Sequence, residues 1–324
     1  MSSTRIRLEA RVPPEAAGRR LDQALAGLFP EYSRTRLKAW IDAGDVRVDG
    51  VVLRPRDRVA GGEAVLVDAG LEDEVAVVPQ PIALDIVHED AALLVINKPA
   101  GLVVHPGAGN PDRTLQNALL AHDPALSTVP RAGIVHRLDK DTSGLLVVAR
   151  TLESHAALVR MLEAREMHRE YEAVCCGVMT GGGTVDVPIG RHPVDRVRMS
   201  VRKDGRESVT HYRVLARFRA HTRVRVILET GRTHQIRVHL AHAGYPIVGD
   251  ATYGRRLAVP KGATPRLEAA LRGFRRQALH AARLSFPHPR TGKACALEAP
   301  LPADMQELLA ALGEDAAAAA RRHG

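Results

Sequence analysis

The segment His136-Arg137-Leu138-Asp139-Lys140-Asp141-Thr142-Ser143-Gly144 decides how the fold of this chain is interpreted. Apolar runs flank it at 132–135 and 145–149, and such aliphatic runs are typical of buried strands. Charged groups between two buried strands lie at the edge of a core, where they are costly unless they are paired or used. Composition alone also allows a simpler interpretation, a polar strand-to-strand loop with a capping Asp and a turn Gly.

The region around this segment, from about Leu84 to Asp304, contains many short strand-like runs and a few helical ones. Apolar patterns predict strands at 92–98, 169–175 and 223–228, and helical spacing predicts helices at 115–121 and 154–163. Because these runs show no regular β-α-β period, we expect an α+β fold rather than a doubly wound parallel sheet. After Leu312 the sequence is rich in alanine and short of core residues, which predicts a frayed helix or a disordered tail.

A smaller module precedes this region, from about Arg19 to Asp68. Leucines at helical spacing predict a helix at 21–28, and Ser33 is the expected N-cap of a second helix that ends at Ala43-Gly44. One face of the second helix carries a basic stripe, which is either solvated or meets phosphates, formed by Arg34, Arg36 and Lys38.

A hairpin signal follows the second helix. The run Val46-Arg47-Val48 alternates, Asp49-Gly50 is a two-residue turn signal, and we expect Val51-Val52-Leu53 to pair back. Gly61-Gly62 and the apolar residues at 65–67 predict another turn and strand.

Composition limits the possible classes of function. The chain has 324 residues, enough for about two domains, and its formal net charge of +9 favours a polyanionic partner, nucleic acid before membrane. A basic balance can also serve solubility alone. Aromatic residues make up only 3%, which argues against a platform that stacks successive bases, so nucleic acid would be held through its phosphates and shape.

The cysteines and the N-terminus indicate the compartment. The three cysteines, Cys175, Cys176 and Cys295, form no C-x-x-C pair and suggest no disulfide framework. The first residues lack the apolar core of a secretory signal, and no apolar stretch approaches 18 residues. We therefore expect a cytoplasmic protein with reduced thiols.

The motifs of both regions resemble known families. The order helix, basic helix and Val-Arg-Val-Asp-Gly hairpin resembles the S4-type (αL) RNA-binding domain. The larger region resembles the RluA-type family of RNA pseudouridine synthases in segments 97–102, 136–144, 169–171 and 231–239, and in 279–281 with 286–289. With an S4-type module in front, the chain is most similar to the RluD-like group, which modifies large-subunit (23S) ribosomal RNA.

The resemblance implies a domain organisation. It places an S4-type domain at 15–75, a linker at 76–83, a catalytic domain at 84–305 and a C-terminal tail at 306–324. For the catalytic domain it implies an α+β fold with a mixed, largely antiparallel central sheet and flanking helices.

The chemistry implied is the isomerisation of uridine to pseudouridine: the bond from C1′ to N1 breaks, the base turns in place, and C5 joins C1′. By the resemblance, Asp139 is the catalytic carboxylate and Arg237 pairs with it, with Arg232 as a second candidate for that pairing. A carboxylate can attack the sugar carbon, add to the base or steady an oxocarbenium-like centre, and the sequence leaves these three roles open.

Further residues take roles by the same resemblance. Tyr171 stacks on the target base, Leu279 packs on the other side of it, and Arg137 helps to turn the nucleotide out of its stack. We expect His136 to order the catalytic loop by hydrogen bonding, and the three basic residues of the second helix to contact phosphates.

The implied partner is ribosomal RNA of the large subunit or its assembly precursor, bound by a monomer without a membrane. We expect neither cofactor nor metal, because the isomerisation needs no redox change or group donor and no complete nucleotide-binding fingerprint occurs.

Two alternatives remain open. One is a non-catalytic RNA-binding ribosome assembly factor whose second domain is silent. The other is a metal-dependent hydrolase with His136, Asp139 and Asp141 as ligands, against which the absence of H-E-x-x-H spacing speaks.

Overall fold

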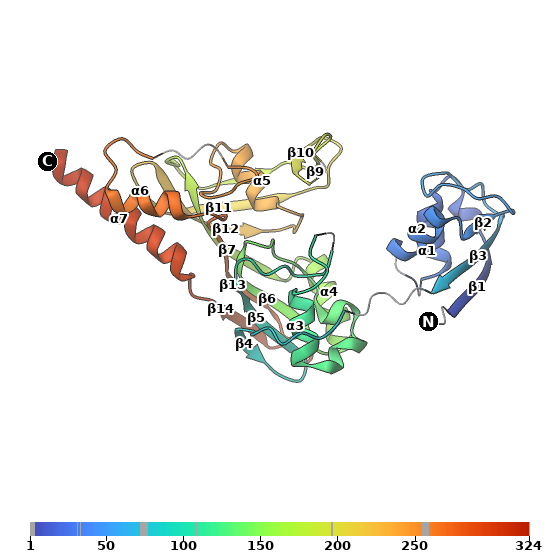
Figure 1. Ribbon diagram of the computed structural model, residues 1–324. Coiled ribbons are helices and arrows are strands. Elements are labelled where there is room, and N and C mark those ends of the chain that lie inside the picture. The colour runs from blue at the N-terminus through green and yellow to red at the C-terminus, as the bar shows by residue number, and fades with distance from the viewer. Residues whose placement is uncertain are drawn as a thin grey trace. The chain divides into compact units, whose positions relative to one another are not determined.

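The computed structural model of the protein divides into two compact units, Met1–Ala76 and Val77–Gly324 (Figure 1). It describes residues 4–30, 32, 34–71, 77–107, 109–195, 197–254 and 259–323. Ser33, the expected cap of the second helix, and Ala76, the first residue of the expected linker, lie outside these ranges. Each unit has a hydrophobic core of its own and is described by itself.

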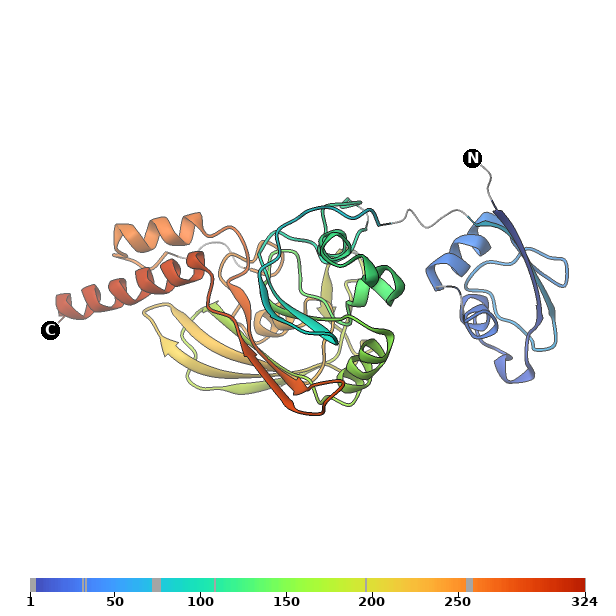
Figure 2. The same ribbon diagram turned by 90° about the horizontal axis from the view of Figure 1, so that it is seen from below.

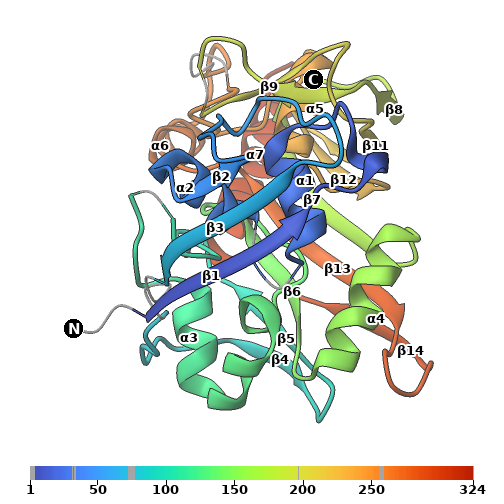
Figure 3. The ribbon, with the colours of Figure 1, turned by 90° about the vertical axis from the view of Figure 1, so that its right-hand side faces the viewer.

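In the first unit, two helices lie on one face of a three-stranded antiparallel sheet (Figure 3). The strands lie in the order β1 (Thr4–Arg11), β3 (Ala64–Leu71), β2 (Val46–Val48), and the helices are η1 (Pro14–Ala16, a 3-10 turn), α1 (Leu21–Leu28) and α2 (Arg34–Ala43). The predicted apolar faces of α1 and α2 are confirmed, since Leu21, Leu25 and Leu37 are each 0% exposed. Burial of such side chains is the main stabilising contribution of short helices.

The predicted hairpin after α2 is only partly correct. Val51 pairs with Val48 through two backbone hydrogen bonds of 2.8 and 2.9 Å, but residues 51–63, all of them described, form no further strand. β2 pairs instead with β3, in the register Val46↔Val67. The side chains of Val51 and Val52 are 58% and 48% exposed, so pairing them would bury little, whereas Val67 is fully buried.

The second unit is built on a nine-stranded mixed sheet. Its strands lie in the order β4 (Ile86–Glu89), β5 (Leu93–Lys98), β6 (Ser143–Ala149), β13 (Leu279–Pro287), β7 (His168–Cys176), β12 (His221–Leu228), β11 (Val209–Arg217), β8 (Gly183–Asp186), and β14 (Ala294–Glu298) pairs with β13. Among the described strands only β6 and β13 run parallel. A separate hairpin consists of β9 (Ile189–Arg191) and β10 (Met199–Val201).

Helices flank this sheet, as Figure 2 shows from below. They are α3 (Leu115–His122), η2 (Pro124–Thr128), η3 (Pro130–Gly133), α4 (Leu152–Glu163), α5 (Gln235–His242), α6 (Pro265–Gly273) and α7 (Ala303–His323). Threonine side chains cap α3, α4 and α6, for example Thr151, whose hydroxyl accepts from the Ser154 N–H at 3.2 Å. The α+β class expected from the sequence is thereby confirmed.

Two expectations about local structure in this unit are wrong. Residues 132–134 are buried and Val135 is partly buried, but they form no strand, because the chain turns through η3 with Arg131 and Ala132 at φ values of 55° and 51°. Ile134 makes one isolated bridge to Val148, and beside it the imidazole of His136, rather than a backbone carbonyl, accepts the Val147 N–H.

The segment after Leu312 is also more ordered than expected. Helix α7 continues to His323, and the buried carboxylate of Asp315 accepts from Arg219 at 2.9 Å and from the Thr264 N–H at 2.7 Å. One buried acid that satisfies two donors therefore holds the end of an alanine-rich helix, which the count of apolar residues could not reveal. None of the helices within the described ranges has the length and hydrophobicity needed to cross a bilayer.

Candidate active site

The loop that carries Asp139 lies between buried Leu138 and strand β6. The Asp139 carbonyl accepts from the Thr142 N–H at 3.1 Å, and the Lys140 carbonyl accepts from the Gly101 N–H at 2.9 Å. The loop ends at Gly144, which has φ +113° and whose added Cβ would lie 2.3 Å from the Ala281 carbonyl oxygen. Only glycine fits there, so the position where the loop enters the sheet is fixed by the close approach of β13.

Lys98 also fixes the loop that carries Asp139. Its side chain is 0% exposed, and Nζ donates to the carbonyls of Pro99, Leu102 and Lys140 at 2.8, 2.9 and 3.0 Å. These three acceptors satisfy the three donors of an ammonium. Burial lowers the pKa of Lys98 to about 8, although the charges of Asp141 and Asp139 favour the charged form.

Asp139 and Arg237 form an ion pair, and a second aspartate holds Arg237 from behind. Arg237 Nη1 lies 3.0 Å from Asp139 Oδ2, while Nε and Nη2 donate to the two oxygens of Asp250 at 2.8 and 2.9 Å. The side chains of Arg237 and Asp250 are 7% and 1% exposed, against 17% for Asp139. Asp250 thus fixes the guanidinium in a bidentate geometry. The Nη1 donor is directed at Asp139, the more exposed of the two carboxylates.

The electrostatics of this cluster keep Arg237 and Asp250 charged. Burial alone would lower the pKa of Arg237, but its hydrogen bonds to Asp250 and the charges of both aspartates raise it above its ordinary value. Burial alone would raise the pKa of Asp250, but Arg237 and the N–H groups of Tyr253 and Thr252 lower it. A cation held this firmly favours the ionised form of any carboxylate beside it.

His234 faces the other oxygen of Asp139. Its Nε2 lies 3.9 Å from Asp139 Oδ1, and its Nδ1 lies 2.8 Å from the Tyr253 hydroxyl, which itself accepts the Met199 N–H at 2.7 Å. Burial lowers the pKa of His234, although the charge of Asp139 opposes this. A neutral ring that accepts the Tyr253 hydroxyl at Nδ1 has its proton on Nε2, on the side of the carboxylate.

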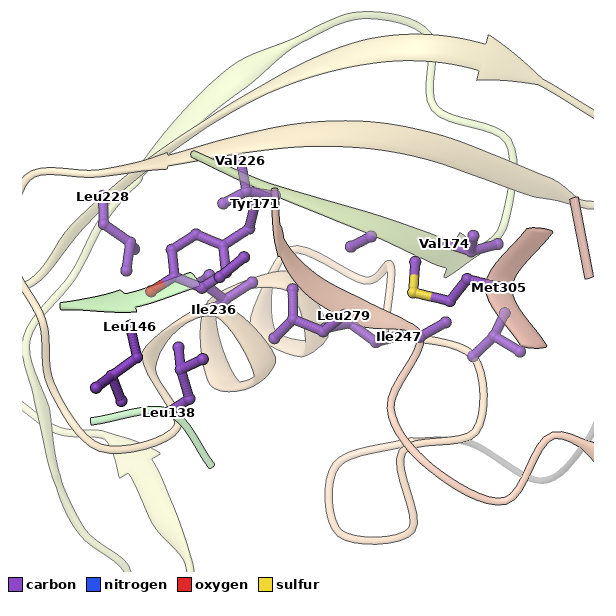
Figure 4. Packing of buried hydrophobic residues seen from close by; sticks show 14 of the residues in the cluster. Leu138, Leu146, Tyr171, Val174, Val226, Leu228, Ile236, Ile247, Leu279 and Met305 are labelled. Atoms are coloured by element: carbon purple, nitrogen blue, oxygen red, sulfur yellow. The ribbon is translucent and has the colours of Figure 1, made fainter. Parts of the chain in front are cut away.

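Tyr171 and Leu279 lie in one apolar wall beside the carboxylate loop. Figure 4 shows Tyr171 from β7, Leu279 from β13 and Leu138 from the loop in the same cluster. Tyr171 and Leu279 are 6% and 3% exposed. Burial raises the pKa of Tyr171, so its hydroxyl remains protonated at neutral pH. The flat face of such a ring can stack on a base, and its polar tip can exchange a proton.

The remaining expected site residues lie in different settings. His136 Nε2 accepts the Val147 N–H at 3.2 Å, and burial lowers the pKa of the ring to about 3, which keeps it neutral for that role. The Arg137 side chain is exposed, and no hydrogen bond or ion pair joins it to another described residue. Arg232 donates through Nε to the Glu207 carbonyl at 3.1 Å, so the described partner of Asp139 is Arg237 and not Arg232.

The basic stripe of α2 lies on the first unit. Arg34 is 62% exposed and lies 3.7 Å from Asp22, Lys38 is 54% exposed and pairs with Asp42 at 2.7 Å, and Arg36 is half-buried. Surface pairs of this kind contribute roughly 0–1 kcal/mol, so a phosphate can compete with them.

Sequence reasoning missed three members of the cluster: Asp250, His234 and Tyr253. Asp250 follows the apolar pair Ile247-Val248 after one glycine, and an acid at the end of a buried run is a signal that indicates a charged partner. His234 lies inside the segment 231–239, but the resemblance gives it no role. Its φ of 56° at the start of α5 is a strained conformation that the sequence does not reveal.

Among the described residues the arrangement offers a carboxylate with one oxygen that Arg237 does not hold, a ring for stacking and an imidazole beside that carboxylate. Such a set can perform nucleophilic or electrostatic catalysis at a sugar carbon or an electron-poor ring. Among the described residues no three His, Cys, Asp or Glu side chains gather as a metal site would require.

Comparison with known proteins places both units. The family model described as RNA pseudouridylate synthase matches residues 92–242, and the S4 domain model matches residues 19–65. The chain is 60% identical to ribosomal large subunit pseudouridine synthase D of Xanthomonas campestris, covering 96% of this chain and 94% of the relative. It is 54% identical to the protein of the same name from Escherichia coli K12, with 96% of each chain covered.

Solved structures agree with this comparison. Human RNA pseudouridylate synthase domain containing 4 superposes with a TM-score of 0.55 at 28% identity, covering 70% of this chain and 92% of that one. Human RNA pseudouridylate synthase domain containing 1 gives a TM-score of 0.53 at 25% identity, covering 72% and 96%.

Proposed function

The chain belongs to the RNA pseudouridylate synthase family, and from that premise we propose that it converts uridines of large-subunit ribosomal RNA to pseudouridine with Asp139 as the catalytic carboxylate. The substrate is taken from relatives named as ribosomal large subunit pseudouridine synthases, which the chain matches over nearly its full length. The observation that carries the assignment of Asp139 is its 3.0 Å contact with Arg237, which is itself held by Asp250.

The proposed reaction balances within the substrate. The C1′–N1 bond of uridine breaks, the detached uracil turns, C5 bonds to C1′, the proton of C5 leaves and N1 gains one. Asp139 Oδ2 is held by Arg237, so Oδ1, which has only His234 Nε2 at 3.9 Å, is the oxygen free to act on the sugar or the base. The isomerisation needs no redox partner or group donor, and we propose that the enzyme uses no cofactor.

Other side chains take supporting roles in this proposal. Tyr171 stacks on the everted uracil, and Leu279 contacts it from the neighbouring strand β13. Arg137, exposed and unpaired in the described structure, takes the place of the flipped nucleotide or holds its flanking phosphate. His136 keeps the loop in register through Val147, and Arg232 contributes a positive charge for substrate binding.

The first unit adds affinity for RNA. Its S4 domain match and the stripe of Arg34, Arg36 and Lys38 support binding to phosphates of structured RNA. We further propose that the protein acts as a monomer in the cytoplasm, where its substrate is assembled.

Tritium release from large-subunit ribosomal RNA labelled at uridine C5 tests the function. We expect release that resists chelators and that Asp139→Asn abolishes while RNA binding is kept. Tight binding without release by the unaltered protein would instead identify a non-catalytic assembly factor, and release that a chelator stops would identify a metal-dependent reaction.

A further inference from the structure

Arg169 is a buried arginine that the proposed mechanism does not use. It lies in β7, two residues before Tyr171, and is 8% exposed. Its Nε is completely buried with no hydrogen-bond partner, and no hydrogen bond or ion pair joins its side chain to any described residue. A buried and unpaired guanidinium is costly, and such groups are rare unless a ligand supplies the missing partner.

The carboxylates around Arg169 are already paired with other arginines. Glu170 and Glu172 contact Arg225 and Arg223 at 3.4 and 2.6 Å. Asp139, the acid of the carboxylate loop, is held by Arg237 at 3.0 Å. Glu170 Oε2 is itself buried without a hydrogen bond, but Glu170 and Glu172 lie on the face of β7 opposite Arg169, so neither carboxylate pairs with it.

Arg169 lies on the same face of β7 as Tyr171. Alternate residues of a strand share a face, and Arg169 and Tyr171 are both buried while His168, Glu170 and Glu172 are not. Arg169 lies directly across the ladder from Leu228, and in Figure 4 the hydroxyl end of Tyr171 points toward the Leu228 side of the cluster. The charge of Arg169 also acts on the pKa of Tyr171, which it lowers against the effect of burial.

The loop opposite leaves room for the guanidinium. A Cβ on Gly231 would lie 2.6 Å from Arg169 Nη1, whereas the next atoms of the same guanidinium lie at 3.6 and 3.8 Å. The absence of a side chain at this position lets Nη1 rest against the turn before α5, the helix that carries Arg237. Arg169 is therefore held between the stacking residue and the element that positions the catalytic pair.

We propose that Arg169 binds a carbonyl oxygen of the target uracil and stabilises the negative charge that develops there. This inference rests on the function proposed above. It holds for each route open to Asp139: addition at C6 moves an electron pair onto O4, and cleavage of the C1′–N1 bond leaves the pair on N1, shared with O2 and O4. Once C5 has bonded to C1′, its proton has left and N1 has gained one, the base is neutral again and the interaction weakens. A donor aimed at charge that exists only during the reaction raises the rate rather than the affinity.

Single-turnover tritium release at saturating enzyme tests this role with Arg169→Gln. We expect the rate to fall about 100-fold, as when one donor of an oxyanion site is removed, while the Kd for the RNA and its salt dependence stay within twofold. Arg225→Gln, the same change on the opposite face of the sheet, is the matched control and should keep its rate. A weaker Kd with a salt slope reduced by about one and an unchanged saturating rate would show a phosphate contact and overturn the proposal.

Melting temperature separates a substrate-binding role from a structural one. Removing an unpaired buried charge should raise the melting temperature of Arg169→Gln by about 3 °C, whereas loss of a structural arginine would lower it. Gly231→Ala keeps Arg169 but displaces Nη1, so it should fold normally and slow release about tenfold. A normal rate for Gly231→Ala or for folded Arg169→Gln would refute the inference, while loss of activity in the unaltered enzyme or its retention in Asp139→Asn would refute the proposed function instead.

Discussion

Replacing Asp250 by asparagine should destabilise the second unit far more than replacing Asp139 does. Asp250 is 1% exposed and accepts two hydrogen bonds from Arg237, together with the N–H groups of Thr252 and Tyr253. Asparagine has one acceptor oxygen and presents an NH₂ group to the donors of Arg237. The guanidinium would then keep only Asp139 as a charged partner.

The magnitude follows from this burial. Removing one partner of a buried ion pair costs about 3–5 kcal/mol. Asp139 is 17% exposed and makes one hydrogen bond to Arg237, so its replacement by asparagine should cost about 1 kcal/mol. For a unit of this size, 1 kcal/mol shifts the melting temperature by about 2–4 °C, so we expect a loss of about 10 °C for Asp250→Asn and about 3 °C for Asp139→Asn.

The effect should also depend on pH. Arg237 and backbone donors lower the pKa of Asp250, so its contribution to stability is complete above the ordinary aspartate pKa of about 4 and is lost as the pH falls below it. The difference between the variant and the unaltered protein should therefore be constant from about pH 8 to pH 5 and shrink in more acidic solution.

Calorimetry with a fluorescence control measures the difference. The only tryptophan of the chain, Trp40, lies in α2 of the first unit, so its emission reports on that unit while the heat signal at the affected transition reports on the second. We expect the Trp40 transition to be unchanged in both variants. Equal losses for Asp250→Asn and Asp139→Asn, or no loss for either, would mean that Asp250 does not hold Arg237 as described.

Three further outcomes follow from the structure. Asp139→Asn should lower tritium release about 1000-fold or more with the RNA Kd retained, and release near the unaltered rate would contradict the assignment. Arg34→Ala with Lys38→Ala should weaken RNA binding and reduce the slope of log K against log salt by about one to two, measured by filter binding, whereas an unchanged slope would mean that α2 does not meet phosphate. Because burial lowers the pKa of His136 to about 3 in the folded protein, the unfolded chain takes up the proton first, and the free energy of unfolding should fall as the pH drops below about 6.5. His136→Gln should make acid unfolding less steep between pH 6.5 and pH 4, and an identical pH dependence would show that His136 is not the titrating group.

The sequence predicts well those elements whose side chains alternate or repeat at helical spacing. Helices α1 and α3 and strands β5 and β12 lie where the apolar periodicity indicated, because each buries one regular face. The buried run 132–135 shows the limit of this reasoning. Hydrophobicity indicated its burial, but the chain turns through η3 and forms no strand there, and His136 instead of a backbone carbonyl accepts the Val147 N–H.

Site residues that belong to a motif can be predicted from the sequence. Residues that only the fold brings to the site cannot. Asp139 and Arg237 are 98 positions apart, yet they were expected together from the resemblance and lie 3.0 Å apart. Asp250 belongs to no periodic apolar pattern and to no motif on which a prediction rests. Asp250 matters because buried Arg237 is stabilised by a second carboxylate. This pairing can be recognised only once the position of α5 in the fold is known.

The parallel pairing of β6 with β13 has a consequence for the synthesis of the protein. Gly144, at the end of the Asp139 loop, is fixed by Ala281, which the ribosome adds 137 residues later, and His280 bonds Ser143 in the same ladder. A nascent chain from which β13 has not yet emerged lacks the strand that fixes this loop. Long-range pairings of this kind form late in folding. We therefore expect truncated or partly translated chains to have no catalytic activity, so that activity appears only once the whole polypeptide has been made.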